Sequence, residues 1–225
     1  MSPPAEPAHP DPAGPSDASA GEAPGPDPAD SGPAGPPEPD PAAAARHPTG
    51  GIAATVLAGI RDVPDYPEPG VMFKDITPLL ADAAGFAAVI EAFAEPHQDR
   101  SSPVDVVAGI EARGFILAAP VALRLGIGFV PLRKRGKLPH TTLGAQYALE
   151  YGTAEIEVHI DAVREGQRVL VVDDVLATGG TAAAACELIE RAGGVVAGIA
   201  VLLELGFLGG RARLAGRQVR SLAEV

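Results

Sequence analysis

The sequence contains little cysteine, no tryptophan and no long apolar run. Its 225 residues include a single cysteine, Cys186. One cysteine excludes an intrachain disulfide framework and any zinc site built on cysteines. No apolar run approaches the length that crosses a bilayer, and no basic stretch followed by an apolar core marks a secretory signal. We therefore expect a cytoplasmic protein with no membrane partner.

Basic residues are also scarce. Lys and Arg number 17 against 29 Asp and Glu, which gives a formal net charge of -12 at pH 7. General nucleic-acid binding depends on clustered Lys and Arg that neutralise phosphates. The charge balance therefore argues against a nucleic-acid partner.

The first 49 residues have almost no large apolar side chains. Of the 24 prolines, 15 lie in the first 50 residues, and eight acidic residues there face one base, Arg46. Such a segment cannot offset the entropy of ordering its backbone by burying apolar surface. We expect residues 1–49 to form a disordered tail rich in Pro, Ala and Asp, and residues 50–225 to form one α/β domain. A proline-rich ligand for a partner domain is the alternative for the tail, although its prolines show no regular spacing and no basic flank.

The rest of the chain alternates between apolar strands and helical patterns. The expected strands cover residues 104–109, 127–132, 168–173 and 194–203. Continuously apolar strands are typical of buried parallel sheets, so we predict an α/β fold with a mainly parallel central sheet flanked by helices.

Four other segments of the chain predict two helices, a loop and a hairpin. Residues 51–62 and a stretch capped by Asp82 have helical spacing, and a proline-rich loop at residues 64–70 separates them. Residues 146–150 and 155–160 flank a Tyr-Gly turn, and residues 155–160 alternate between polar and apolar side chains. This pattern predicts a hairpin projecting from the sheet.

The sharpest signal is a strand, loop and helix at residues 169–181. The strand leads to the carboxyl edge of the sheet, where α/β folds bind ligands. Ala177, Thr178, Gly179, Gly180 and Thr181 then turn into a helix whose first amides are unpaired donors. The glycines let the backbone approach an anion, and the threonines add hydroxyl donors. No Lys follows the glycines and no Gly-x-Gly-x-x-Gly is present, so the pattern predicts a seat for a phosphate monoester.

Asp173 and Asp174 stand directly before this loop. Two adjacent carboxylates can accept hydrogen bonds from the vicinal hydroxyls of a ribose or help to position a divalent cation. Because successive side chains of a strand point to opposite sides, one of the two can serve only to orient the loop.

Residues 169–181 (VLVVDDVLATGGT) resemble the 5-phosphoribosyl-1-pyrophosphate (PRPP) motif of the type I phosphoribosyltransferases. Four other segments are similar to the adenine phosphoribosyltransferases and occur in that family's order. They are residues 65–78 (DYPEPGVMFKDITP), 111–115 (EARGF), 131–139 (PLRKRGKLP) and 148–152 (ALEYG). The resemblance covers residues 52–223.

This resemblance implies a reaction and a fold. The reaction is adenine plus PRPP giving AMP plus pyrophosphate, a step of purine salvage. The fold is that of the type I phosphoribosyltransferases, with a projecting flap hairpin and a small N-terminal hood. It also implies a homodimer, in which an arginine near residue 133 reaches the neighbouring subunit's site, and Mg²⁺ bound mainly through PRPP and pyrophosphate.

The resemblance assigns a role to each candidate residue. The PRPP seat comprises Asp173, Asp174, Ala177, Thr178, Gly179, Gly180 and Thr181. Arg113, Arg133 and Lys137 contact pyrophosphate, and arginine suits such oxygens because its donors form a rigid fork. Met72, Phe73 and Lys74 form the adenine pocket, with Phe73 packed on the purine and backbone atoms reading its edge. Glu150 is the catalytic acid–base at N7 of the purine, and Tyr151 is a flap residue.

The histidines show no metal-ligand spacing, so we expect no metal site built by protein ligands alone. Two other functions remain open at this point: a phosphoribosyltransferase for xanthine, hypoxanthine or orotate, and a regulator that uses PRPP only as a signal. A regulator of transcription would need a DNA-binding module, and no recognition helix is visible in the sequence.

Overall fold

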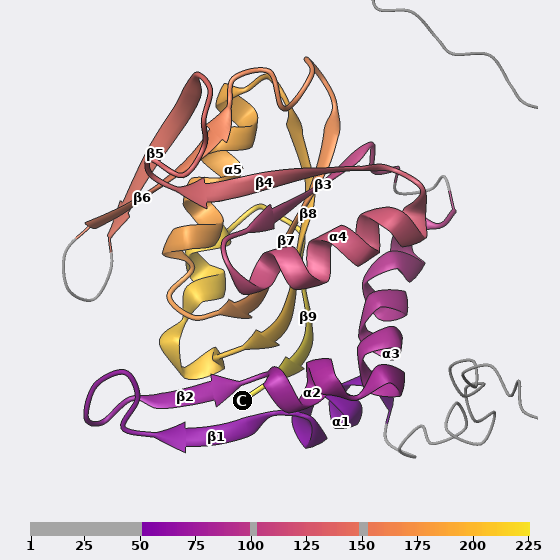
Figure 1. The fold of residues 1–225 in the computed structure, drawn as a ribbon, viewed down its shortest axis with the longest axis vertical. Helices are drawn as coiled ribbons and strands as arrows, with labels where there is room; N and C mark the ends of the chain where they lie inside the picture. Colours follow the sequence, from indigo (N-terminus) through magenta and orange to yellow (C-terminus); the bar gives the residue numbers. More distant parts are fainter. Residues whose placement is uncertain (1–50, 100–102, 149–152) are drawn as a thin grey trace, which may run out of the picture. The chain divides into compact units, whose positions relative to one another are not determined.

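A computed structural model describes residues 51–99, 103–148 and 153–225. Its main feature is a seven-stranded sheet in the order β5-β6-β4-β3-β7-β8-β9 (Figure 1). The five strands from β4 to β9 in that order run parallel. They are β3 (Val106–Ile110), β4 (Gly128–Lys134), β7 (Arg168–Leu176), β8 (Val195–Glu204) and β9 (Val219–Glu224). The predicted mainly parallel α/β fold is confirmed.

Helices cover both faces of this sheet. Val169 and Val171 of β7 pack in one core cluster with α5 (Gly180–Arg191). Leu170 and Val172 pack in a second cluster with α3 (Ala83–Ala94) and α4 (Arg113–Leu125). Because side chains alternate along a strand, a continuously apolar strand such as β7 fills both cores at once.

The start of α3 and the end of α4 follow from the sequence. The Asp82 carboxylate accepts hydrogen bonds from the Ala84 and Gly85 amides at 3.2 Å, which confirms the predicted cap of α3. Gly126, with φ of 68°, ends α4 in the left-handed conformation that glycine adopts without strain. No helix among the described residues is long and apolar enough to cross a membrane.

The segment before α3 differs from its prediction. The first helix, α1 (Gly51–Ala58), stops four residues early, and the proline-rich stretch belongs to an antiparallel hairpin of β1 (Arg61–Pro64) and β2 (Met72–Asp75). A short helix, α2 (Thr77–Ala81), follows this hairpin. These elements lie at the end of the sheet toward which β7, β8 and β9 point, in the place expected for a hood (Figure 1).

The predicted projecting hairpin consists of β5 (Thr142–Ala148) and β6 (Thr153–His159). β5 begins four residues earlier than expected. β6 joins the main sheet through only two residue pairs, Arg133 with Glu157 and Lys134 with Ile156. The hairpin therefore extends away from the sheet edge (Figure 1), and the turn at residues 149–152 lies outside the described residues.

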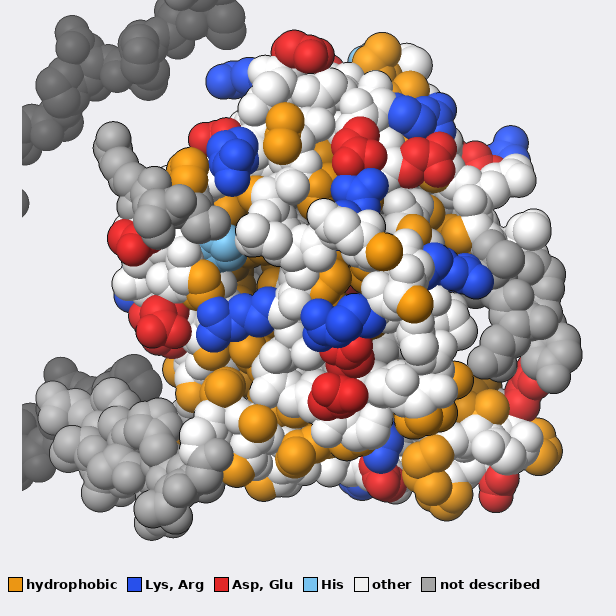
Figure 2. All heavy atoms as spheres, turned by 180° about the vertical axis from the view of Figure 1, so that it is seen from behind, with side chains coloured by type: hydrophobic (Ala, Val, Ile, Leu, Met, Phe, Trp, Pro, Cys, Tyr) orange, Lys and Arg blue, Asp and Glu red, His pale blue; other side chains and the backbone are white. Residues whose placement is uncertain are grey.

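Acidic and basic side chains are mixed on the surface. On the face seen from behind, Lys and Arg side chains lie among Asp and Glu side chains (Figure 2). Ion pairs account for part of this mixing, such as Arg217 with Glu190 at 2.6 Å and Arg124 with Glu91 at 2.7 Å.

Candidate active site

The phosphate loop connects β7 to α5 at the carboxyl end of the sheet. The sequence predicts that this strand ends at Asp173, whereas β7 continues to Leu176, so both Asp173 and Asp174 lie within it. Gly179 has φ of 78° and stands at the N-cap of α5, and no side chain among the described residues caps that helix. The first amides of α5 are therefore free to donate to an anion, aided by the helix dipole. The geometry of the loop is compatible with an anion at this helix terminus, and the role of residues 177–181 as a phosphate seat stays a prediction.

The two acidic residues of β7 have different surroundings. Asp174 is buried, whereas Asp173 is partly accessible. The Asp174 backbone N–H donates to Asp173 Oδ1 at 2.9 Å. Burial and the neighbouring charge of Asp174 raise the pKa of Asp173 well above its usual range. Burial raises the pKa of Asp174 as well, but the Arg113 guanidinium opposes that rise.

Arg113 links the carboxylate pair to the hood. Its Nε lies 2.7 Å from Asp174 Oδ2 in an ion pair, although Oδ2 has no hydrogen-bond partner of suitable geometry within the described residues. Its Cζ lies 4.9 Å from the centroid of the Phe73 ring. Tyr66 packs edge-on against the same ring with centroids 5.1 Å apart. Arg113, the first residue of α4, thus brings an aromatic surface of the hood to the ribose side of the phosphate loop.

Arg133 and Lys137 come together at the end of β4. Arg133 Nη1 donates to the Lys137 carbonyl oxygen at 2.9 Å, and Arg133 Nε lies 3.4 Å from Glu111 Oε2. β3 ends at Ile110, opposite Leu132, so Glu111 follows β3 beside Arg133, which is still part of β4 and pairs with Glu157 of β6. Lys137 is exposed and makes no ion pair within the described residues. The segment therefore presents cations on the same edge of the sheet as Arg113.

Glutamates hold this basic segment in place. The Lys134 amide donates to Glu111 Oε2 at 2.8 Å, and the Gly136 amide donates to Glu157 Oε2 at 3.0 Å. Arg135 forms an ion pair with Glu155 of the flap at 3.1 Å. The sequence did not predict these anchors, because Glu155 and Glu157 lie on β6, and only the pairing of β6 with β5 was expected, not its pairing with β4.

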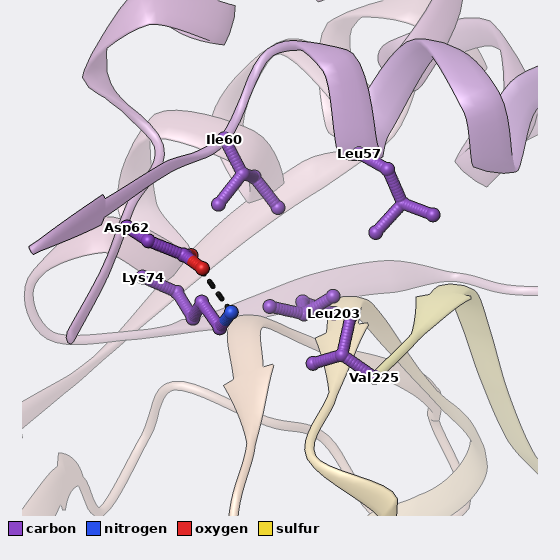
Figure 3. Close-up of a pocket in the computed structure, with 6 residues that line it drawn as sticks. All are labelled: Leu57, Ile60, Asp62, Lys74, Leu203 and Val225. Carbon is purple, nitrogen blue, oxygen red and sulfur yellow. Dashed lines mark hydrogen bonds and ion pairs between the residues drawn. The ribbon is translucent and has the colours of Figure 1, made fainter. Parts of the chain in front are cut away.

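The three hood residues assigned to adenine do not share one face. Lys74 pairs with Asp62 at 2.7 Å and lines a cavity of about 210 Å³ with Leu57, Ile60, Leu203 and Val225 (Figure 3). Phe73, the next residue of β2, faces the opposite side, toward Arg113. The Met72 side chain is 48% exposed. Phe73 is therefore the hood side chain that meets the ribose side of the site, and Lys74 can contribute there through its backbone.

Comparison with known proteins agrees with this geometry. Residues 75–217 match the family model described as phosphoribosyl transferase domain. The adenine phosphoribosyltransferase of Acidothermus cellulolyticus is 63% identical over 178 residues, which cover 79% of this chain and 99% of the relative. The chain belongs to the adenine phosphoribosyltransferase family.

Solved structures of this family share the fold. The adenine phosphoribosyltransferase of Thermoanaerobacter pseudethanolicus aligns with a TM-score of 0.74 and 50% identity, covering 77% of this chain and 99% of that one. The Saccharomyces cerevisiae enzyme, solved with an imino-altritol bisphosphate and adenine, aligns with a TM-score of 0.71 and 36% identity over 76% of this chain and 98% of that one. The predicted type I phosphoribosyltransferase fold is confirmed.

Two residues predicted for this family site cannot be placed. In the sequence, Glu150 and Tyr151 stand between the two strands of the flap hairpin, and both lie outside the described residues. The strands on either side of them end at Ala148 and resume at Thr153. The roles of both residues therefore stay predictions.

The raised pKa of Asp173 leads to a pH prediction for this family member. A raised pKa in the folded state adds stability at low pH, and this stability is lost as pH rises through the raised pKa. PRPP binding has the opposite dependence, because ribose hydroxyls donate to the ionised carboxylate. We expect the KM for PRPP to rise as pH falls through the raised pKa of Asp173, and the variant Asp173→Asn to show a weaker rise. Steady-state kinetics of the wild-type protein and the variant measures this difference, because the titration of PRPP itself affects both equally. Equal pH profiles would contradict the role predicted for Asp173.

Proposed function

We propose that the protein transfers the 5-phosphoribosyl group of PRPP to N9 of adenine, giving AMP and pyrophosphate. One observation carries this proposal: the Arg113 guanidinium contacts both the Asp174 carboxylate and the Phe73 ring. A ribose seat and an aromatic surface for a base therefore lie on either side of one side chain. The bound adenine of the yeast relative, which is 36% identical, supports adenine as the base.

The substrates are held by different elements of the fold. The amides and hydroxyls of residues 177–181 hold the 5-phosphate, and Asp173 and Asp174 accept hydrogen bonds from the ribose hydroxyls. Arg113, Arg133 and Lys137 bind pyrophosphate as it leaves. Adenine packs on Phe73, while the backbone of Met72 and Lys74 reads its edge. Together these contacts place N9 opposite C1 of the ribose, so the reaction gains from proximity and orientation.

Proton transfer belongs to the flap in this proposal. The transition state is oxocarbenium-like, so it needs nearby carboxylates and no covalent nucleophile. Glu150 hydrogen-bonds N7 of the purine and gives or takes a proton there while N9 bonds to C1 of the ribose and the bond from C1 to pyrophosphate breaks. Tyr151 closes with the same turn, which excludes water that would hydrolyse the activated sugar.

Magnesium fits this site as a part of the substrate. Among the described residues, no group of three or more His, Cys, Asp or Glu could hold a metal ion. Among the described residues, the buried Oδ2 of Asp174 accepts no hydrogen bond of suitable geometry, although Arg113 Nε lies 2.7 Å away, and carboxylate oxygens are ligands that Mg²⁺ accepts. Asp173 and Asp174 would therefore face an ion carried by PRPP oxygens. Bound there, Mg²⁺ neutralises part of the pyrophosphate charge.

The remaining expectations concern assembly, location and the tail. We propose a homodimer in which Arg133 or Arg135 reaches the neighbouring subunit's site; the Arg135 side chain is 70% exposed, and its one ion-pair partner among the described residues is Glu155. We also propose that the reaction occurs in the cytoplasm and that residues 50–225 form the catalytic domain, with residues 1–49 dispensable for activity.

Turnover separates this enzyme from a PRPP-sensing regulator. With Mg²⁺, PRPP and adenine, we expect AMP and pyrophosphate to form in equal amounts, at a kcat on the order of 1–10³ s⁻¹. Chromatography of the nucleotides and a pyrophosphatase-coupled assay measure the two products. A protein that binds PRPP but forms neither product is a sensor, and the proposal is then wrong.

A further inference from the structure

A short helix behind the phosphate loop packs directly against it. This helix, η4 (Gly210–Leu214), follows a turn after β8. A Cβ atom placed on Gly210 would overlap the Ala177 carbonyl oxygen and would lie 2.9 Å from the Gly179 nitrogen. A Cβ placed on Gly179 would in turn overlap the Gly210 carbonyl oxygen. The two backbones thus meet with no room for a side chain on either one.

The reason for glycine differs between the two positions. Gly179 has φ of 78°, a conformation that favours glycine whatever its neighbours are. Gly210 is not among the glycines with positive φ, so alanine could adopt its backbone conformation. Space alone, next to Ala177 and Gly179, therefore restricts position 210 to glycine.

The residue after Gly210 fixes η4 to the sheet. Arg211 Nε donates to Glu204 Oε1 at 2.9 Å, and its Nη2 bonds the other oxygen of the same carboxylate. Arg211 Nη1 donates to the Val219 carbonyl oxygen at 2.9 Å, and Ser221 Oγ donates to Glu204 Oε2 at 2.9 Å. Glu204 ends β8 and is only 5% exposed. Bidentate arginine–carboxylate pairs hold their partners in a defined geometry, and here the carboxylate is buried while the Arg211 side chain is 49% exposed.

We propose that Gly210 and Arg211 are positioning residues for the 5-phosphate of PRPP. Arg211 anchors η4 to β8 and β9, and Gly210 holds the Ala177–Gly179 backbone from behind in the shape that binds phosphate. This inference rests on the proposed function, because it takes residues 177–181 as the seat of that phosphate. Neither residue touches the substrate in this account; both act through the loop.

The two neighbouring glycines offer a matched pair of variants. Gly210→Ala pushes the loop, whereas a Cβ on Gly209 meets no atom within 4 Å, although Gly209 has φ of 64°. Gly209→Ala therefore introduces backbone strain in the same turn without contact with the loop. We expect Gly210→Ala to weaken binding of ribose 5-phosphate about tenfold and to raise the KM for PRPP by a similar factor, because small displacements of a binding group are costly. We expect the KM for adenine to stay within about twofold, and Gly209→Ala to change each constant less than about threefold.

Calorimetric binding of ribose 5-phosphate makes this test independent of turnover. If the wild-type protein binds ribose 5-phosphate but forms no AMP, the proposed function fails while the inference about the loop is still tested. Unchanged ribose 5-phosphate binding in Gly210→Ala would overturn the inference. Equal weakening in Gly209→Ala and Gly210→Ala would overturn it too, since the effect would then come from the turn in general.

Arg211 provides a second route if Gly210→Ala does not fold. Arg211→Met should weaken ribose 5-phosphate binding, and Arg211→Lys should restore part of it. The control is Arg217→Met, because Arg217 also forms a bidentate pair, with the more exposed Glu190 at 2.6 and 3.0 Å, and makes no hydrogen bond or ion pair with residues 177–181 in the described part of the chain. A purely structural role for Arg211 would lower the melting temperature and leave ribose 5-phosphate binding as in Arg217→Met, which would contradict the proposal.

Discussion

Replacing Glu150 by Gln lowers kcat about a hundredfold and changes the KM for PRPP by less than about twofold, because general acid–base catalysis contributes factors of this size. Gln keeps the size and polarity of the side chain but cannot exchange a proton with N7 of adenine. In the proposed site PRPP is held by the phosphate loop and the cations of β4 and α4, which this substitution does not change. Steady-state kinetics with each substrate varied in turn measures the effect.

A matched control lies on the same hairpin. Glu155 belongs to β6 and pairs with Arg135. Glu155→Gln alters a flap carboxylate without removing the predicted acid–base, so its kcat should stay within about threefold of the wild-type value. Equal losses in the two variants would mean that the charge of the flap matters and not the proton of Glu150. Unchanged turnover in Glu150→Gln would remove this residue from catalysis.

Replacing Arg113 by Met lowers the free energy of unfolding by about 2 kcal/mol and weakens PRPP binding. Removing one partner of a buried ion pair costs about 3–5 kcal/mol. We expect less here, because the Arg113 side chain is 35% exposed whereas that of Asp174 is 7% exposed. The loss arises because the Asp174 carboxylate is left buried without a countercharge. Urea unfolding at neutral pH measures the change.

A double variant separates the effect on stability from the effect on binding. Arg113→Met with Asp174→Asn removes the uncompensated charge, so most of the lost stability should return while PRPP binding stays weak. Arg124→Met is the surface control: the Arg124 and Glu91 side chains are 45% and 51% exposed, and such pairs contribute about 0–1 kcal/mol. If Arg113→Met costs no more than Arg124→Met, the buried pair does not have the role assigned to it.

The parallel core and the phosphate loop could be predicted because their signals are local. The apolar run of β7, the two acids and the Gly179–Gly180 turn all lie within a few residues. The sequence predicts that β7 ends at Asp173, because polar residues often follow the end of a buried strand. In the structure Asp174 continues the strand, and Arg113 compensates its charge. Arg113 lies far from Asp174 in the sequence, so no local pattern predicts this ion pair.

The hood and the edge of the sheet were harder to predict. β1 is a four-residue strand ending in Pro64, and its proline content indicates a loop until β2 pairs with it. β9 was not predicted, since its sequence gives no strong alternation and its place beside β8 depends on tertiary packing. Because the hairpin was not predicted, the opposite directions of the Phe73 and Lys74 side chains were not predicted either. Neighbouring side chains of a strand point to opposite sides, whereas those of a loop need not.

Competition among bases for limiting PRPP tests the central claim most directly. The protein is incubated with Mg²⁺, PRPP and an equimolar mixture of adenine, hypoxanthine, guanine, xanthine and orotate, and the nucleotides are separated by chromatography. A site built to hydrogen-bond the amino edge of adenine should favour AMP over each other product by a factor on the order of 10⁴. A mixture in which IMP, GMP, XMP or OMP equals or exceeds AMP would contradict the account.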